Sequence, residues 1–428
     1  MSATTTAYDS IRHQVLEDLE RRRVDPDTDL DGVRALVTAA VDAYQRDAHL
    51  GEHRALADPG DMVARVTAAI TDFGPLSELF ARDDVEEVFI EGPRVTYIDR
   101  TGRLQGLAVP TTEQENRQLV DRLLATTQRN LDAKTPLVQA RVLDGRARLT
   151  AAQPPVSDQL SATIRRHIIK RETLRSLVGY GSLSIEAAGY LWALMQSSGS
   201  VLVSGPPGAG KTSLLSAMIA AVPSNHCVRA CEEIRELHVP LTHGAYYEAR
   251  PPALDGSSEV SLRDLVKFVL AMRPDLIVVG EVRGSEAFEL TRAVNAGCGF
   301  CCTVHANSAR DALAALVNAA TMAGENVRDE VVRRVFSSAI DVVVHLDRDD
   351  INQADTEVGI RRQVMEIVGV VPAMAADEFS TESIFLRSAL GKPLQWTGAV
   401  PADAERVDRS LPEGMTLRAI LEGRVTPL

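Results

Sequence analysis

Residues 205–212 read GPPGAGKT and match the phosphate-binding pattern G-x-x-x-x-G-K-[ST]. An apolar run ends at Ser204, directly before this loop, and a helical pattern begins at Gly210. Glycines let the backbone wrap closely around phosphate oxygens, and the N-terminus of a helix turns bare N–H groups toward them. A strand, this loop and a helix in that order predict an α/β nucleotide-binding domain.

The loop itself carries most of the expected contacts with ATP. Lys211 would reach the β- and γ-phosphates, and Thr212 would hold Mg²⁺ through its hydroxyl. The expected nucleotide-binding residues of this segment are Gly205, Pro206, Pro207, Gly208, Ala209, Gly210, Lys211, Thr212 and Ser213. The plainer alternative, a glycine-rich turn with one surface lysine, is disfavoured by the flanking strand and helix.

Strands and helices alternate after Ser184, which predicts a parallel sheet covered on both faces. Expected helices cover 184–197, 211–221, 261–272, 285–296 and 308–322. Expected strands cover 200–204, 227–231, 276–280, 300–304 and 359–371. The tail 372–428 shows little periodicity beyond a short helix near 417–421.

The chain before this region shows two other patterns. Residues 1–72 carry apolar positions at three- and four-residue steps, which predicts a helical arm. Residues 73–175 predict a compact α+β domain. Its expected elements are strands at 85–90 and 95–98, a turn at Thr101-Gly102, a helix from the capping box at Thr112 to about Arg129, and a hairpin over 137–152.

The charge of the chain argues against a general nucleic-acid coat protein. Lys plus Arg number 46 and Asp plus Glu number 59, so the net charge is −13. Residues 117–175 depart from this balance, because 12 basic and 5 acidic side chains leave a local charge of +7. This segment is either a solvated face or a supply of arginines for a nucleotide or a neighbouring subunit.

Polar side chains follow three of the expected strands. Glu281 ends the apolar run at 276–280, Glu232 and Glu233 follow 227–231, and His305 follows 300–304. The carboxyl ends of parallel strands share one edge, where a P-loop enzyme needs a carboxylate beside Mg²⁺ and a group that orients water. The plainer alternatives are a helix cap for Glu281, a charged loop for the two glutamates and a structural role for His305.

Five cysteines in 428 residues are too sparse to indicate a disulfide framework. Cys227 with Cys231 and Cys298 with Cys301 have the spacing of metal half-sites, but four of the five cysteines fall on expected buried strands. We therefore expect no zinc. The sequence has neither a visible signal peptide nor a run of 18 apolar residues, which predicts a protein of a reducing cytosol.

Taken together, these motifs resemble the CpaF-like ATPases, the hexameric motors of type II and type IV secretion and pilus assembly. The resemblance covers about Phe73 to Val371. It rests on the P-loop followed in order by CEEIREL, YYEARPP, RPDLIVVGEVRG and TVHANSARDAL. It implies a RecA-like P-loop motor domain preceded by the α+β domain and the helical arm. The implied division is 1–72, 73–175, 176–371 and a C-terminal extension over 372–428.

The resemblance also implies roles for single residues. Glu232 and Glu233 would place metal and water, with Glu233 as the Mg²⁺ ligand, Glu281 would polarise water or the γ-phosphate, and His305 would sense that phosphate. Four further positions match family arginines, and some would serve a neighbouring subunit's nucleotide: Arg165, Arg250, Arg273 and Arg283. Two departures are Glu232-Glu233 in place of the usual Glu-Asp and Gly297-Cys298-Gly299 in place of a Gly-His pair.

By this resemblance, a ring of six subunits hydrolyses ATP with Mg²⁺ and powers pilus assembly or protein secretion. The ring is expected in the cytoplasm, peripherally associated with the inner membrane through a polytopic assembly protein. Two other functions remain open at this point. One is a conjugative DNA-transfer motor, although nucleic acid is not the expected partner, and the other is a non-catalytic nucleotide-binding regulator.

Overall fold

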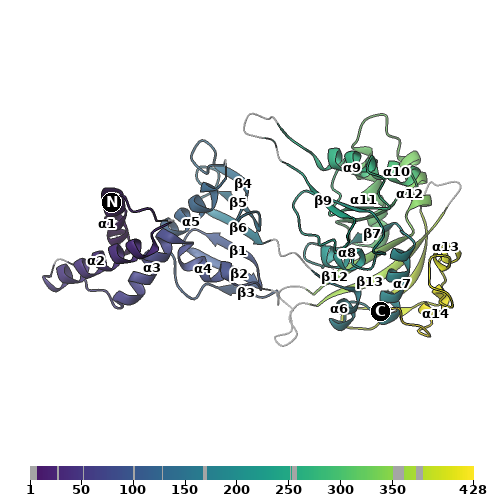
Figure 1. Cartoon of the computed structure of the whole chain (residues 1–428), viewed down its shortest axis with the longest axis horizontal. Coiled ribbons are helices and arrows are strands. Elements are labelled where there is room, and N and C mark those ends of the chain that lie inside the picture. The colour runs from purple at the N-terminus through teal and green to yellow at the C-terminus, as the bar shows by residue number, and fades with distance from the viewer. Residues whose placement is uncertain are drawn as a thin grey trace. The chain divides into compact units, whose positions relative to one another are not determined.

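The computed structural model describes residues 7–26, 28–51, 53–99, 102–127, 129–166, 171–250, 252, 258–349, 361–372 and 379–428. The chain folds as two compact units, Met1–Ile168 and Ile169–Leu428 (Figure 1). No helix in the described ranges is long and apolar enough to cross a membrane.

The first unit begins with helices, as the sequence predicts for 1–72. They are α1 (Ala7–Arg22), α2 (Leu30–His49) and α3 (Pro59–Thr71). Their apolar stripes form one core that includes Ile11, Val37 and Val66. Helices α2 and α3 begin at aspartate N-caps, because the carboxylates of Asp29 and Asp58 accept hydrogen bonds from backbone N–H groups of the following turn.

The helical arm packs against helix α5 (Glu113–Ala125) of the α+β part. The Arg65 guanidinium donates to both carboxylate oxygens of Glu115 at 2.9 Å, and Arg122 donates to the Ile70 carbonyl oxygen. The Glu115 carboxylate also accepts from Thr112 in the predicted capping box, which the structure confirms. One carboxylate therefore both starts α5 and anchors the arm.

A six-stranded antiparallel sheet forms the rest of the first unit, in the order β3-β2-β1-β6-β5-β4. Its strands are β1 (Val85–Glu91), β2 (Arg94–Asp99), β3 (Leu104–Gly106), β4 (Leu137–Val142), β5 (Ala147–Ala152) and β6 (Ser161–Arg166). The short helices η1 (Gly74–Leu76) and α4 (Ser77–Ala81) precede it. The predicted strands and hairpin are confirmed. Helix α5 ends four residues before the predicted Arg129, and Thr101 of the predicted turn lies outside the described residues.

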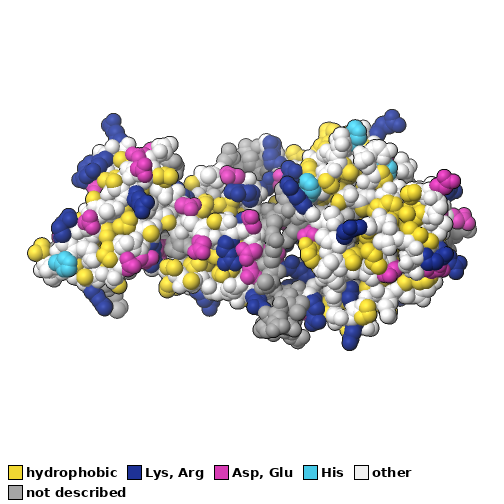
Figure 2. All heavy atoms as spheres, turned by 60° about the horizontal axis from the view of Figure 1, so that its bottom comes forward, with side chains coloured by type: hydrophobic (Ala, Val, Ile, Leu, Met, Phe, Trp, Pro, Cys, Tyr) yellow, Lys and Arg dark blue, Asp and Glu magenta, His cyan; other side chains and the backbone are white. Residues whose placement is uncertain are grey.

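On the face shown in Figure 2, basic and acidic side chains are interspersed over the first unit.

The second unit is built on a nine-stranded sheet in the described part of the chain, ordered β15-β14-β13-β12-β7-β11-β10-β8-β9. The parallel part contains β12 (Val342–Arg348), β7 (Val201–Ser204), β11 (Gly299–Val304), β10 (Leu276–Val279), β8 (Val228–Glu232) and β9 (Gly244–Glu248). The predicted strands at 200–204, 227–231, 276–280 and 300–304 are confirmed within one residue.

Helices pack on both faces of this sheet (Figure 1). One core contains residues of α6 (Leu174–Gly179), α7 (Ile185–Gln196), α8 (Lys211–Ile219), α13 (Ala404–Asp408) and α14 (Leu417–Leu421). The other contains residues of α9 (Leu262–Leu270), α10 (Glu286–Asn295), α11 (Ala309–Thr321) and α12 (Asp329–Ala339). Alternate β10 residues enter opposite cores, as expected for a strand buried on both faces.

The sheet also has an antiparallel part, whose direction the sequence analysis did not predict. Strands β13 (Arg362–Val371), β14 (Ser380–Arg387) and β15 (Leu394–Trp396) add to β12 in antiparallel order. Ile384 and Phe385 of β14 are fully buried in the same core as α7. Strands β14 and β15 thus continue the sheet and core of this unit, although the sequence analysis set 372–428 apart.

Candidate active site

The P-loop lies between the end of β7 and the start of α8, as predicted. Gly208 and Gly210 have φ angles of 75° and 95°, in the left-handed region that favours glycine. Lys211 is buried, and its Nζ donates to the carbonyl oxygens of Gly205 at 3.0 Å and Pro206 at 3.1 Å. Among the described residues, no side chain caps the N-terminus of α8. The loop therefore offers an ammonium group and uncapped helix N–H groups at one place.

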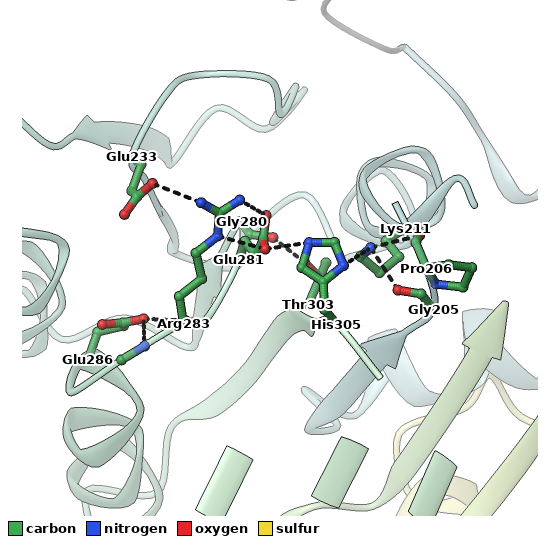
Figure 3. A network of polar contacts seen from close by, with 11 residues as sticks. Gly205, Pro206, Lys211, Glu233, Gly280, Glu281, Arg283, Glu286, Thr303 and His305 are labelled. Atoms are coloured by element: carbon green, nitrogen blue, oxygen red, sulfur yellow. Dashed lines mark hydrogen bonds and ion pairs between the residues drawn. The ribbon is translucent and has the colours of Figure 1, made fainter. Parts of the chain in front are cut away.

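His305 lies between Lys211 and Glu281 (Figure 3). Its Nδ1 is 3.2 Å from Lys211 Nζ, and its Nε2 is 2.7 Å from Glu281 Oε1. Burial lowers the pKa of His305, and the positive charge of Lys211 lowers it further, while Glu281 opposes the shift. A neutral imidazole protonated at Nε2 fits both contacts, because it accepts from the ammonium and donates to the carboxylate.

Glu281 directly follows Gly280 at the end of β10 and is held by Arg283. Arg283 Nε and Nη2 donate to the two Glu281 oxygens at 2.7 and 2.9 Å. Burial raises the pKa of Glu281, but the Arg283 hydrogen bonds and the charges of Arg283, His305 and Lys211 outweigh it, so the pKa is lowered. Glu281 is therefore ionised at neutral pH.

The same guanidinium reaches a second carboxylate, because Arg283 Nη1 lies 3.8 Å from Glu233 Oε2 (Figure 3). A continuous row of charged and polar groups thus runs from the P-loop lysine through His305, Glu281 and Arg283 to Glu233. Its members follow the carboxyl ends of four parallel strands, β7, β11, β10 and β8, which share one sheet edge. This is the arrangement predicted from the sequence.

Two residues that the sequence analysis did not select hold this row in position. Glu286, in the first turn of α10, accepts from the backbone N–H groups of Arg283 at 2.6 Å and Gly284 at 2.8 Å. Thr303 donates its hydroxyl to the Gly280 carbonyl oxygen at 2.7 Å. The acidic residue in the first turn of the helix predicted at 285–296 was the available signal for Glu286.

Glu232 has a different environment from Glu233. Its side chain is buried and accepts hydrogen bonds from the backbone N–H groups of Glu236 at 3.2 Å and Leu237 at 3.1 Å. Burial raises the pKa of Glu232 to about 8, and those hydrogen bonds oppose the shift only in part. The structure therefore gives Glu232 the contacts of a residue that supports the loop 233–237, outside the row of interacting side chains.

The other arginines selected from the sequence are Arg250 and Arg273 in the second unit and Arg165 in the first. Arg250 is exposed and donates from Nε to the Ser258 carbonyl oxygen at 2.6 Å. Arg273 is exposed with φ of 49° and precedes β10, at the amino edge of the sheet opposite the P-loop. Arg165 belongs to the first unit, where its Nε is 3.6 Å from Glu87 Oε1. Among the residues that the structure describes, neither Arg250 nor Arg273 forms a hydrogen bond or ion pair with a P-loop residue.

The residues present fit a nucleotide with Mg²⁺. The positive-φ glycines, Lys211 and the uncapped start of α8 suit phosphate oxygens. Thr212 is half-buried in the first turn of α8, and Glu233 is 54% exposed, so a hydroxyl and a carboxylate are available as the oxygen ligands that Mg²⁺ prefers.

Four of the five cysteines are buried, and Cys227 is half-buried. Burial raises the pKa of the Cys231 and Cys298 thiols to about 12, which keeps them protonated. The described residues contain no group of three or more His, Cys, Asp or Glu side chains arranged to hold a metal ion.

Comparison with known proteins identifies the family. The type II/IV secretion system protein family matches residues 70–378. A putative conjugal transfer protein of Mycobacterium tuberculosis is 30% identical over 338 residues, which cover 77% of this chain and 94% of that protein. The type IV secretion system protein VirB11 of Bartonella henselae is 25% identical over 66% of this chain and 90% of its own length.

A solved structure shares the fold. The ATPase DotB of Yersinia pseudotuberculosis matches with a TM-score of 0.51 and 16% identity, over 70% of this chain and 78% of that chain. The chain belongs to the type II/IV secretion system protein family, and it is an ATPase of that family.

Proposed function

We propose that this ATPase acts as a ring-shaped, Mg²⁺-dependent motor of the CpaF-like kind, which powers pilus assembly or protein secretion. The observation that supports this proposal is the row of contacts from Lys211 through His305 and Glu281 to Arg283. It joins a lysine of the phosphate-binding loop to an ionised carboxylate, and ATP hydrolysis by a P-loop enzyme needs both a phosphate-binding lysine and a group that orients the attacking water.

Each residue of the row has a separate task in this proposal. Lys211 neutralises the phosphate charge of ATP, and Glu281 orients and polarises the attacking water. His305 contacts both side chains, so a change in the charge at the γ-phosphate would alter its hydrogen bonds and be transmitted to Glu281. Arg283 keeps Glu281 ionised and fixes its orientation. Mg²⁺, when held by Thr212 and Glu233, would neutralise charge that develops on the phosphates.

The P-loop assignment is tested by Lys211→Ala. Lys211 is buried in the loop, and no other lysine stands in the GPPGAGKT segment, so this variant should lose hydrolysis and bind ATP much more weakly. Phosphate release and ATP affinity should be measured beside a thermal melt. Near-normal turnover in a folded variant would refute the site.

We further propose that the active form is a hexamer in which an arginine such as Arg250 serves the neighbouring subunit. Arg250 supports this because it is exposed and, in the described part of the chain, forms no hydrogen bond or ion pair with its own P-loop residues. Mixing Lys211→Ala subunits with Arg250→Ala subunits should restore part of the activity, since some interfaces would then hold both intact groups. Full activity of a proven monomer would refute the ring.

The expected place of the ring is the cytoplasmic face of the inner membrane, bound to a polytopic assembly protein. This proposal rests on the family and on the secretion-system names of the relatives. Fractionation of cells with and without the polytopic assembly protein would test this proposal. The ring should leave the membrane fraction when that protein is absent.

A conjugative DNA-transfer motor is the second candidate. It is favoured by the conjugal-transfer name of the mycobacterial relative and by a row of arginines on adjacent strands of the first unit. Arg148 pairs in register with both Arg141 and Arg165, so the three side chains share one face of the sheet. ATP turnover should be measured with and without single- and double-stranded DNA. A large stimulation that salt abolishes would favour DNA transport, and its absence would favour pilin or protein substrates.

A further inference from the structure

An additional arginine lies directly beside the P-loop. Strand β12 pairs in parallel with β7, with His345 opposite Ser204, and it ends at Arg348. A Cβ atom on Gly208 would lie 3.6 Å from both Cζ and Nη1 of Arg348. The guanidinium group therefore reaches the middle of the phosphate-binding loop, although it comes from a strand far away in the sequence.

The charge of Arg348 is not matched by a carboxylate of the residues that the structure describes. Among the described residues, no acidic side chain forms an ion pair with the Arg348 guanidinium, which is half-buried. Its cross-strand neighbour is Arg362, another cation, and like charges directly opposite each other are unfavourable. Arg361, next in the sequence, differs because its Nε donates to Asp349 Oδ2 at 2.7 Å. A half-buried cation beside a phosphate-binding loop fits an anionic ligand.

The order of the strands indicates which end of the ligand this cation meets. His305 and Glu281 follow β11 and β10, on one side of β7, and Arg348 ends β12 on the other side. ATP lying along the loop with its γ-phosphate toward Lys211 and Glu281 would leave its α-phosphate end on the β12 side. We propose that Arg348 binds the nucleotide at its α-phosphate end. This inference rests on the proposed nucleotide site.

The proposal predicts a specific pattern of affinities. ATP and ADP share their α-phosphate, so Arg348→Ala should weaken the binding of both nucleotides by the same factor, about tenfold or more for a lost charged hydrogen bond. Arg348→Gln, which retains much of the side-chain stem, should show the same loss, and Arg348→Lys should show a smaller one because it keeps the charge. Titration calorimetry with ATP and with ADP measures each factor.

Arg361→Ala is the matched control, since its guanidinium is already paired with Asp349. It should leave both affinities unchanged, and melting temperatures without nucleotide should be alike for all Arg348 variants. Unchanged affinity in folded Arg348→Ala or Arg348→Gln would overturn the proposal, as would a loss confined to ATP or an equal loss in Arg361→Ala. If the unaltered protein binds neither nucleotide, the proposed site itself fails, whatever Arg348 does.

Discussion

Strands β8 and β10 each lead into a glutamate, but the pKa values of the two glutamates shift in opposite directions. The two strands are parallel neighbours, with Cys231 opposite Val279, and a glutamate stands at or just after the end of each. Glu232 is buried, and burial raises its pKa to about 8. Glu281 lies against Arg283 and His305, and its pKa is lowered.

The difference comes from the neighbouring groups. Burial raises the pKa of both carboxyl groups, but only Glu281 has a bidentate arginine and a nearby lysine that favour its charged form. In the described part of the chain, Glu232 accepts hydrogen bonds from backbone N–H groups alone. These bonds hold the loop 233–237 but do not offset the pKa increase that burial causes. A glutamate at the end of a parallel strand is therefore a catalytic candidate only where a cation accompanies it.

The first prediction compares the same substitution at both positions. Glu281→Gln should still bind ATP but lower kcat on the order of 10²-fold, because Gln keeps the shape of the side chain and loses its charge. Glu232→Gln should lower kcat by less than about tenfold, since that carboxyl group lies outside the row of interacting side chains. Steady-state phosphate release at saturating ATP measures both.

Nucleotide binding serves as the control for that comparison. If Glu281→Gln cannot bind ATP, Glu281 has a role in folding instead. If the two variants lose activity equally, the distinction between the two strand ends is wrong, and the family-based role for Glu232 regains its support.

Some residues of the candidate site could be predicted from the sequence, and others could not. The P-loop, Glu281 and His305 were found because each follows a continuous apolar strand, and parallel strands bring their carboxyl ends to one edge. The sequence did not indicate which of Glu232 and Glu233 faces Arg283. Adjacent residues at a strand end point to opposite sides, and packing decides on which side Arg283 lies. Arg348 was not found, because its proximity to Gly208 depends on which strand lies beside β7.

Prediction of the fold is limited in the same way, because the sequence indicates single elements better than it indicates how they are arranged. The predicted strands and helices between 184 and 322 formed, since short continuous apolar runs alternate there with longer helical segments. The antiparallel addition of β13 and β14 was missed because strand direction is set by the chain connections and not by the residues within a strand. Helix α12 was also missed, although its first turn is acidic and its apolar residues Val332 and Phe336 are four apart.

The second prediction concerns the contact between the two strand ends. A Cβ atom on Gly280, the residue before Glu281, would lie 2.7 Å from Glu232 Cγ and 2.9 Å from its Oε1. Gly280→Ala should lower the free energy of unfolding by about 1–3 kcal/mol, as overpacking in a buried site does, and it should reduce kcat by displacing Glu281. Denaturant unfolding and phosphate release test the two effects.

The double variant Gly280→Ala with Glu232→Ala checks the cause. Removing the Glu232 side chain gives the new methyl group room, so the double variant should be less destabilised than the sum of the single variants. Strict additivity would show that Glu232 is not what restricts position 280, and the two strand ends would then be independent.

The last prediction, with the least effect on activity, is a pH dependence of stability. The pKa of Glu232 is about 8 in the folded protein, against 4.5 ordinarily, because the carboxyl group is buried. Between those two values the unfolded chain has released this proton while the folded chain retains it. Raising the pH in that window therefore favours unfolding, with a slope of at most about 1.4 kcal/mol per pH unit.

Glu232→Gln carries no titrating group at this position, so its stability should rise relative to that of the unaltered protein as the pH increases from 5 to 8. Denaturant unfolding of both proteins at pH 5, 6.5 and 8 gives this difference directly, and all other titrating groups cancel in the comparison. Parallel stability curves would mean that Glu232 is ionised in the folded state. A cation would then have to accompany it, and the contrast between the two strand ends would disappear.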